Sequence, residues 1–144
     1  MSRRTVLFMA ILLGCAASLG AAPAPAVSAA TYQDPEALFA LVSQKLEPYV
    51  LVDVRSGPEY QAGHIPTAIN VPVAQVTASP SLQDKGALII LYCASGMRAA
   101  AAKNALDNAG YTRVVDFGTV YRWPAELATG AEPGDCPCQE SPQG

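Results

Sequence analysis

Apolar and polar positions alternate along the chain in blocks that predict strands and helices in turn. Four short apolar runs predict buried strands, at residues 50–54, 68–73, 88–92 and 114–117. Four further segments combine helix formers with start or stop signals and predict helices, at residues 34–46, 57–62, 98–109 and 121–128. Because strand and helix alternate, the sequence predicts an α/β fold with a mostly parallel sheet.

The third apolar run ends at a cysteine. Cys93 opens a short loop, residues 93–98, that leads directly into the helix predicted over residues 98–109. A turn from strand to helix gathers backbone N–H groups and the positive end of the helix dipole. Such surroundings stabilise anionic sulfur. Ligands of parallel sheets bind beyond the carboxyl ends of the strands, so Cys93 is the candidate nucleophile.

Residues 1–30 have the pattern of a secretory signal peptide followed by a linker. Arg3 and Arg4 precede an apolar stretch at residues 5–19 that is too short for a comfortable transmembrane helix. We therefore expect an exported, periplasmic protein. Two interpretations of processing stay open. One is ordinary cleavage within residues 20–30. The other is a lipobox ending at Cys15, whose cysteine would be lipidated; only in that case would the protein be attached to a membrane.

The charge of the chain bears on its partners. All 144 residues carry a formal net charge of −3, and loss of the two arginines of the signal would move it to −5. An acidic chain without a basic stretch argues against nucleic acid as a partner. A small anion can still bind, because local N–H dipoles and one arginine outweigh a diffuse net charge at short range.

The four cysteines leave an odd number after export. With Cys15 removed or lipidated, Cys93, Cys136 and Cys138 remain, and an odd count indicates a free reactive thiol. Cys136 and Cys138 lie in a Pro/Gly/Asp segment, residues 131–144, that we expect to be a flexible tail. They could pair with each other, resolve an oxidised Cys93, or bind a metal. Two thiols and the single His64 make a poor ligand set, so we expect no metal.

Three motifs, in order, resemble those of rhodanese domains of the single-domain, exported bacterial type. The first has Leu-Val-Asp-Val-Arg at residues 51–55, Glu-Tyr at 59–60, Gly-His-Ile-Pro at 63–66 and Ala-Ile-Asn at 68–70. The second is the loop at residues 92–99, and the third combines residues 110–111 with 118–123. The resemblance covers residues 31–130, which we take as the domain. It implies a five-stranded, mostly parallel sheet flanked by helices.

The resemblance also implies an activity. In rhodaneses the loop cysteine, here Cys93, takes sulfur from thiosulfate or a similar donor as a persulfide and passes it to cyanide or a thiol. It implies no cofactor. The loop residues that would bind the donor are Ala94, Ser95, Gly96, Met97 and Arg98. Asp53 and Arg55 would brace the loops by hydrogen bonds rather than act chemically.

Loop length separates two kinds of chemistry. Related phosphatases have five residues between cysteine and arginine, which makes a cradle wide enough for phosphate. Four residues separate Cys93 from Arg98, which favours sulfur transfer. Two other hypotheses stay open. One is a thiol or persulfide relay in which Cys136 and Cys138 work with Cys93 and hand on to a thiol protein; the other is a binding module without turnover.

Overall fold

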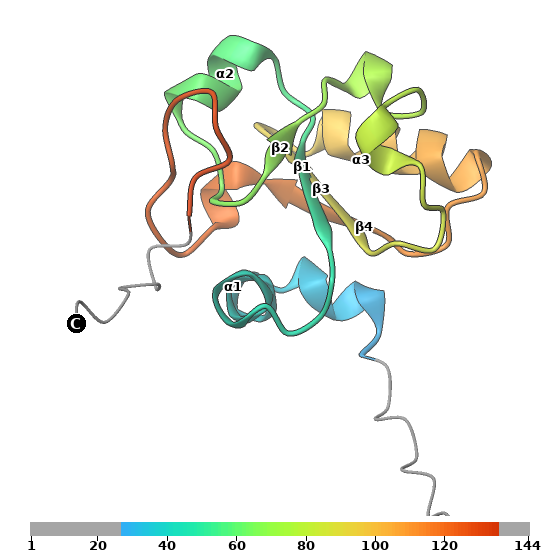
Figure 1. The fold of residues 1–144 in the computed structure, drawn as a ribbon, viewed down its shortest axis with the longest axis horizontal. Coiled ribbons are helices and arrows are strands. Elements are labelled where there is room, and N and C mark those ends of the chain that lie inside the picture. The colour runs from blue at the N-terminus through green and yellow to red at the C-terminus, as the bar shows by residue number, and fades with distance from the viewer. Residues whose placement is uncertain (1–26, 136–144) are drawn as a thin grey trace, which may run out of the picture.

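A computed structural model describes residues 27–135 of the chain. A single sheet of four parallel strands forms its centre, in the order β2-β1-β3-β4 (Figure 1). The strands are β1 (Val50–Asp53), β2 (Ile69–Asn70), β3 (Ile89–Cys93) and β4 (Val114–Thr119). The α/β fold with a parallel sheet is therefore confirmed. The fifth strand implied by the family resemblance is not among the described residues.

Helices cover both faces of the sheet. Helix α1 (Pro35–Gln44) lies on one face and α3 (Met97–Asn108) on the other, while the short α2 (Gly57–Ala62) follows β1 at the edge where the strands end (Figure 1). Four 3-10 helices complete the elements: η1 (Ala29–Gln33), η2 (Val73–Gln75), η3 (Pro80–Leu82) and η4 (Val120–Arg122). Within residues 27–135, no helix is long and apolar enough to cross a bilayer.

The buried residues of β3 alternate between the two faces, as expected for a strand with helices on both sides. Ile90 and Tyr92 pack with α1, whereas Ile89, Leu91 and Cys93 pack with α3. This alternation decides on which side of the sheet the thiol lies. Cys93 belongs to the same apolar cluster as the first turns of α3, including Ala99 and Ala102 on that helix.

Two elements predicted from sequence differ in the structure. The helix predicted over residues 121–128 is wrong, because only the single turn η4 forms there. Trp123 precedes Pro124 and is extended, with φ −65° and ψ 126°; a proline excludes the helical conformation from the residue before it. The strand predicted over residues 68–73 is shortened to Ile69–Asn70, and Pro72, which has no N–H to donate, follows it.

The packed region extends beyond both predicted domain boundaries. At its start, Ala29 packs against the core. At its end, the carbonyl of Pro133 accepts from the backbone N–H of Thr67 at 2.8 Å. Pro133 and Gly134, expected in a flexible tail, are therefore hydrogen-bonded to the domain. The rest of the expected tail and signal lie outside the described residues.

Candidate active site

Cys93 is the last residue of β3 and is fully buried. Its Sγ accepts a hydrogen bond from the backbone N–H of Gly96 at 3.0 Å. The parallel register places Cys93 beside Thr119, the last residue of β4. Among the described residues it is the one cysteine, and its thiol is free. The sulfur thus lies at the carboxyl edge of the sheet, at the base of the loop that leads into α3.

Two glycines shape the loop around the sulfur. Gly96, the residue before α3, has φ 90°, a left-handed conformation that L side chains rarely adopt. Gly118 has φ 89° and lies opposite, so that a Cβ on Gly96 would stand 3.7 Å from its Cα. The Thr119 hydroxyl then donates to the carbonyl of Ala94 at 2.5 Å. The end of β4 therefore supports the loop from one side.

The side chain of Arg98 is held from the other side of the loop by Glu59. Its Nη1 donates to Oε2 at 2.9 Å and its Nη2 to Oε1 at 2.8 Å, a two-pronged ion pair. Each side chain is 37% exposed. The bond to Glu59 raises the pKa of Arg98 above its usual range, against the effect of burial, and the nearby Cys93 adds to the rise.

Glu59 is itself fixed, because it belongs to the capping box of α2. Its Oε2 accepts from the backbone N–H of Ser56 at 3.0 Å and from the Ser56 hydroxyl at 2.7 Å. The hydrogen bonds from Arg98 and then from Ser56 hold the pKa of Glu59 well below its usual range. The carboxylate is therefore ionised and stationary beside Arg98.

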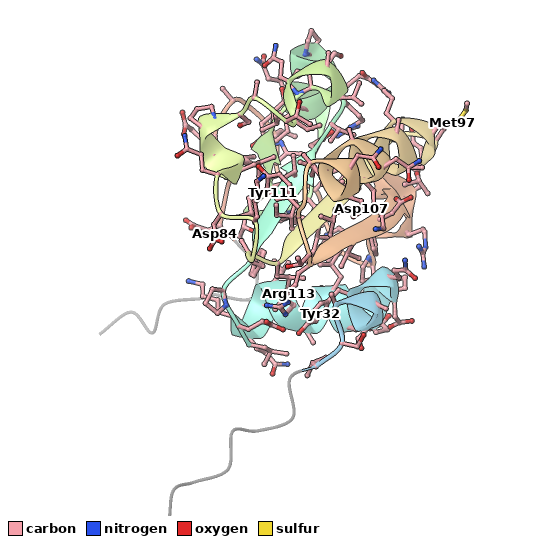
Figure 2. The ribbon with its side chains drawn as sticks, turned by 90° about the vertical axis from the view of Figure 1, so that its right-hand side faces the viewer. Tyr32, Asp84, Met97, Asp107, Tyr111 and Arg113 are labelled. Carbon is pink, nitrogen blue, oxygen red and sulfur yellow. The ribbon has the colours of Figure 1, made fainter. Side chains whose placement is uncertain are left out.

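The remaining loop residues differ in exposure. Ala94 and Gly96 are half-buried, whereas Ser95 and Met97 are exposed. Met97, the first residue of α3, is 79% exposed and points away from the body of the domain (Figure 2). The structure thus brings Cys93 and Gly96 into direct contact and leaves Ser95 and Met97 at the solvent side of the loop.

Asp53 and Arg55 form a buried ion pair at the end of β1. Arg55 Nη2 donates to Asp53 Oδ2 at 2.6 Å and to the carbonyl of Gly63 at 2.6 Å. Asp53 is fully buried and Arg55 is 7% exposed. The amide of Asn70 donates to the carbonyls of Asp53 and Arg55, at 3.0 and 2.9 Å. These bonds tie β1, the turn at Gly63 and β2 together.

His64 is fully buried between two carbonyl oxygens. Its Nδ1 lies 2.9 Å from the carbonyl of Tyr60 and its Nε2 lies 3.3 Å from that of Pro133. Its ring stacks on Tyr60 with centroids 3.7 Å apart. Both ring nitrogens face backbone carbonyls, so the imidazole joins α2 to Pro133.

Sequence reasoning missed two residues that shape the site. Glu59 belongs to the first sequence motif, and its bond to Arg98, 39 positions along the chain, has no local signature. Thr119 lies in the third sequence motif, but nothing in that motif indicates its bond to Ala94. The one available clue was topological: loops that follow parallel strands meet at the same edge of the sheet. Cys15, Cys136 and Cys138 lie outside the described residues.

The sequence and this geometry agree with one known family. Residues 36–119, more than half of the chain, match the family model of the rhodanese-like domain. The chain belongs to the rhodanese-like domain family. The resemblance seen in the three sequence motifs is thereby confirmed, and the loop containing Cys93 lies within the matched region.

Relatives and solved structures of this family carry different activities. The chain is similar to the thiosulfate sulfurtransferase PspE of Escherichia coli, 35% identical over 69 residues that cover 46% of this chain and 66% of PspE. It is also similar to human M-phase inducer phosphatase 2, 34% identical over 74 residues, covering 43% and 13% of the two chains. The chain thus spans less than two thirds of the length of either relative.

The fold is shared with a solved rhodanese. A structure described as rhodanese with anions from E. coli has a TM-score of 0.54 and 30% sequence identity, and the match covers 57% of this chain and 99% of that one. Nearly all of that structure therefore superimposes on part of this chain.

Proposed function

We propose that this chain is a sulfurtransferase that moves sulfane sulfur through a persulfide on Cys93. The observation that carries the proposal is the hydrogen bond from the Gly96 N–H to Cys93 Sγ at the start of α3. Backbone donors and the helix dipole stabilise an anion at that place, and both the thiolate and the persulfide are anions. The name of the relative PspE supports the same activity class.

The first half-reaction forms the persulfide. The Cys93 thiolate attacks the outer sulfur of thiosulfate and forms a new S–S bond, while the S–S bond of thiosulfate breaks and its electron pair leaves with sulfite. In the second half, cyanide or a thiolate attacks the outer sulfur of the persulfide. Thiocyanate or a new persulfide leaves, and the electron pair of the broken bond restores the Cys93 thiolate. No external oxidant, reductant or cofactor takes part.

The loop geometry favours sulfur over phosphate as the transferred group. Four residues separate Cys93 from Arg98, one fewer than in related phosphatases, and Arg98 is bound by Glu59. A phosphate dianion would have to compete with Glu59 for the guanidinium. We therefore propose no phosphatase activity, and hydrolysis of p-nitrophenyl phosphate that is lost in Cys93→Ala would contradict this.

A second candidate is a thiol relay through Cys136 and Cys138. It is favoured by one observation: the carbonyl of Pro133 accepts from the Thr67 N–H, which ties the chain to the domain three residues before Cys136. A Cys136→Ser/Cys138→Ser double variant separates the two candidates. Unchanged thiocyanate production excludes an obligatory relay, whereas loss of transfer to a thiol protein with persulfide formation intact supports one.

Intact mass spectrometry after incubation with thiosulfate tests the main proposal. We expect the wild type to gain the mass of one sulfur atom, to lose it again on addition of cyanide, and Cys93→Ala to gain nothing. A wild type without the gain, or equal transfer by Cys93→Ala, would overturn the proposal.

We also propose that residues 1–30 direct export to the periplasm. The N-terminal mass of protein from whole cells distinguishes ordinary cleavage from lipidation at Cys15.

A further inference from the structure

The loop at residues 93–98 contains a single cationic side chain, and that side chain is paired with a carboxylate. Within residues 93–98 Arg98 is the one basic residue. Both terminal nitrogens of Arg98 donate to Glu59, at 2.8 and 2.9 Å. The loop therefore presents an ion pair to an incoming anion, instead of a free guanidinium.

Glu59 cannot easily leave this position. Besides Arg98, it accepts two hydrogen bonds from Ser56 and thereby caps the first turn of α2. If the Glu59 side chain rotated away from Arg98, it would lose both hydrogen bonds of the ion pair. It would also lose the two bonds from Ser56 that cap α2. The negative charge is thus a fixed part of the site, not a mobile counter-ion that a substrate displaces.

The other charged groups near the loop are also engaged. At the end of β4, Asp116 accepts from the Gly118 N–H at 2.8 Å. Arg122 donates to the carbonyls of Phe117 and Gln33, at 2.8 Å each. Among the described residues, Arg98 and Arg122 therefore both have partners, and so do the two carboxylates of Glu59 and Asp116.

From this arrangement we infer that Glu59 sets the charge preference of the site, so that donors with one negative charge bind better than doubly charged thiosulfate. Backbone N–H groups and the helix dipole can hold the single charge on the transferred sulfur. A second charge on the donor finds Arg98, the one cation within residues 93–98, already neutralised by Glu59. The donors favoured are thiosulfonates, R–SO₂–S⁻, and persulfides of neutral thiols.

This inference rests on the proposed sulfurtransferase function and concerns its donor. With a thiosulfonate, the Cys93 thiolate takes the outer sulfur and the electron pair of the broken S–S bond leaves with the sulfinate. The same persulfide results as with thiosulfate. Glu59 touches no reacting atom, so it is a positioning and specificity residue that acts through Arg98.

Methanethiosulfonate and thiosulfate form the matched pair of probes, because they have similar size and differ by one charge. Steady-state kinetics with cyanide as the acceptor gives kcat and KM for each donor. We expect a lower KM for methanethiosulfonate in the wild type. In Glu59→Gln we expect the ratio of kcat/KM for thiosulfate to that for methanethiosulfonate to rise about threefold to fivefold, the effect of one half-exposed charge. The rise should come from KM, because glutamine still caps α2 and the nucleophile is unchanged.

Two controls separate specificity from a structural effect. Glu47→Gln removes an equally paired carboxylate, bonded to Arg113 and Tyr32 at 2.8 Å, outside the loop region, and should leave the donor ratio unchanged. Adding Glu59→Gln to an Arg98→Gln background should shift the ratio much less than in the wild type, because Glu59 acts through Arg98.

The outcomes distinguish this inference from the function on which it rests. If both donors transfer sulfur but the wild type has the lower KM for thiosulfate, or Glu59→Gln leaves the ratio unchanged, the charge preference is wrong and the sulfurtransferase function stands. An equal shift in Glu47→Gln also overturns it. If neither donor transfers sulfur, both the function and the inference fall.

Discussion

Gly96 donates its backbone N–H to Cys93 Sγ from a left-handed conformation with φ 90°. The residue that turns the chain into α3 is therefore the same residue that contacts the sulfur. Gly96 therefore sets both the backbone turn into α3 and the hydrogen bond to the sulfur at the end of β3. The relationship leads to the first of four predictions.

Replacing Gly96 by alanine should lower both stability and transfer. An L residue at φ 90° is strained, and we expect a loss of about 1–2 kcal/mol in the free energy of unfolding and a reduced kcat. Steric overlap is a minor factor, since the new Cβ would stand 3.7 Å from Gly118. Urea unfolding and thiocyanate production measure the two effects. Gly57→Ala, at the first position of α2 and without a positive φ, is the matched control and should cost nothing.

Replacing Asp53 by asparagine should cost about 3–5 kcal/mol of stability, because it leaves the charge of Arg55 buried without its partner. The two side chains are 0% and 8% exposed in their ion pair. Lys103→Gln removes an exposed pair with Asp107, 32% and 42% exposed, and should cost less than about 0.5 kcal/mol. Urea unfolding of both variants tests this, and equal losses would contradict the assigned role of burial.

Replacing His64 by phenylalanine should destabilise the domain and leave the chemistry intact. The ring can still stack on Tyr60, and the carbonyls of Tyr60 and Pro133 keep backbone donors, the N–H groups of Gly63 and Thr67. The hydrogen bond from the imidazole is lost, at a cost of about 1 kcal/mol. We expect kcat within twofold of the wild type at a temperature where both proteins are folded. A folded variant that forms persulfide but cannot pass it on would instead make His64 part of the transfer step.

The contribution of Glu59 to stability should depend on pH. Arg98 and Ser56 hold the pKa of Glu59 below its ordinary value near 4.5, so the stabilisation is present above that pH and fades as pH falls toward the folded-state pKa. The difference in free energy of unfolding between wild type and Glu59→Gln should therefore shrink below about pH 4.5. A difference in the free energy of unfolding that is constant between pH 3 and pH 7 would rule out this ion-pair contribution.

Much of the fold could be predicted from periodicity and local signals. The apolar runs around Val52, Ile90 and Val115 lie in strands, and the helix formers after Arg98 lie in α3. These predictions succeeded because burial on a strand or a helix face repeats at short range along the chain. The helix predicted after Tyr121 does not form, because Pro124 disfavours the helical conformation of Trp123 and this outweighs the apolar spacing.

The site was predictable in part for the same reason. Contiguous residues were enough to predict that Cys93 ends a buried strand and that a glycine-containing loop leads into a helix. The partners of these residues follow from the folded arrangement: Glu59 on Arg98, Thr119 on Ala94, and the Pro133 carbonyl beside the buried imidazole of His64. Such pairs depend on the order of parallel strands and on which loops meet at their carboxyl ends, and local periodicity does not record contacts between segments far apart in the chain.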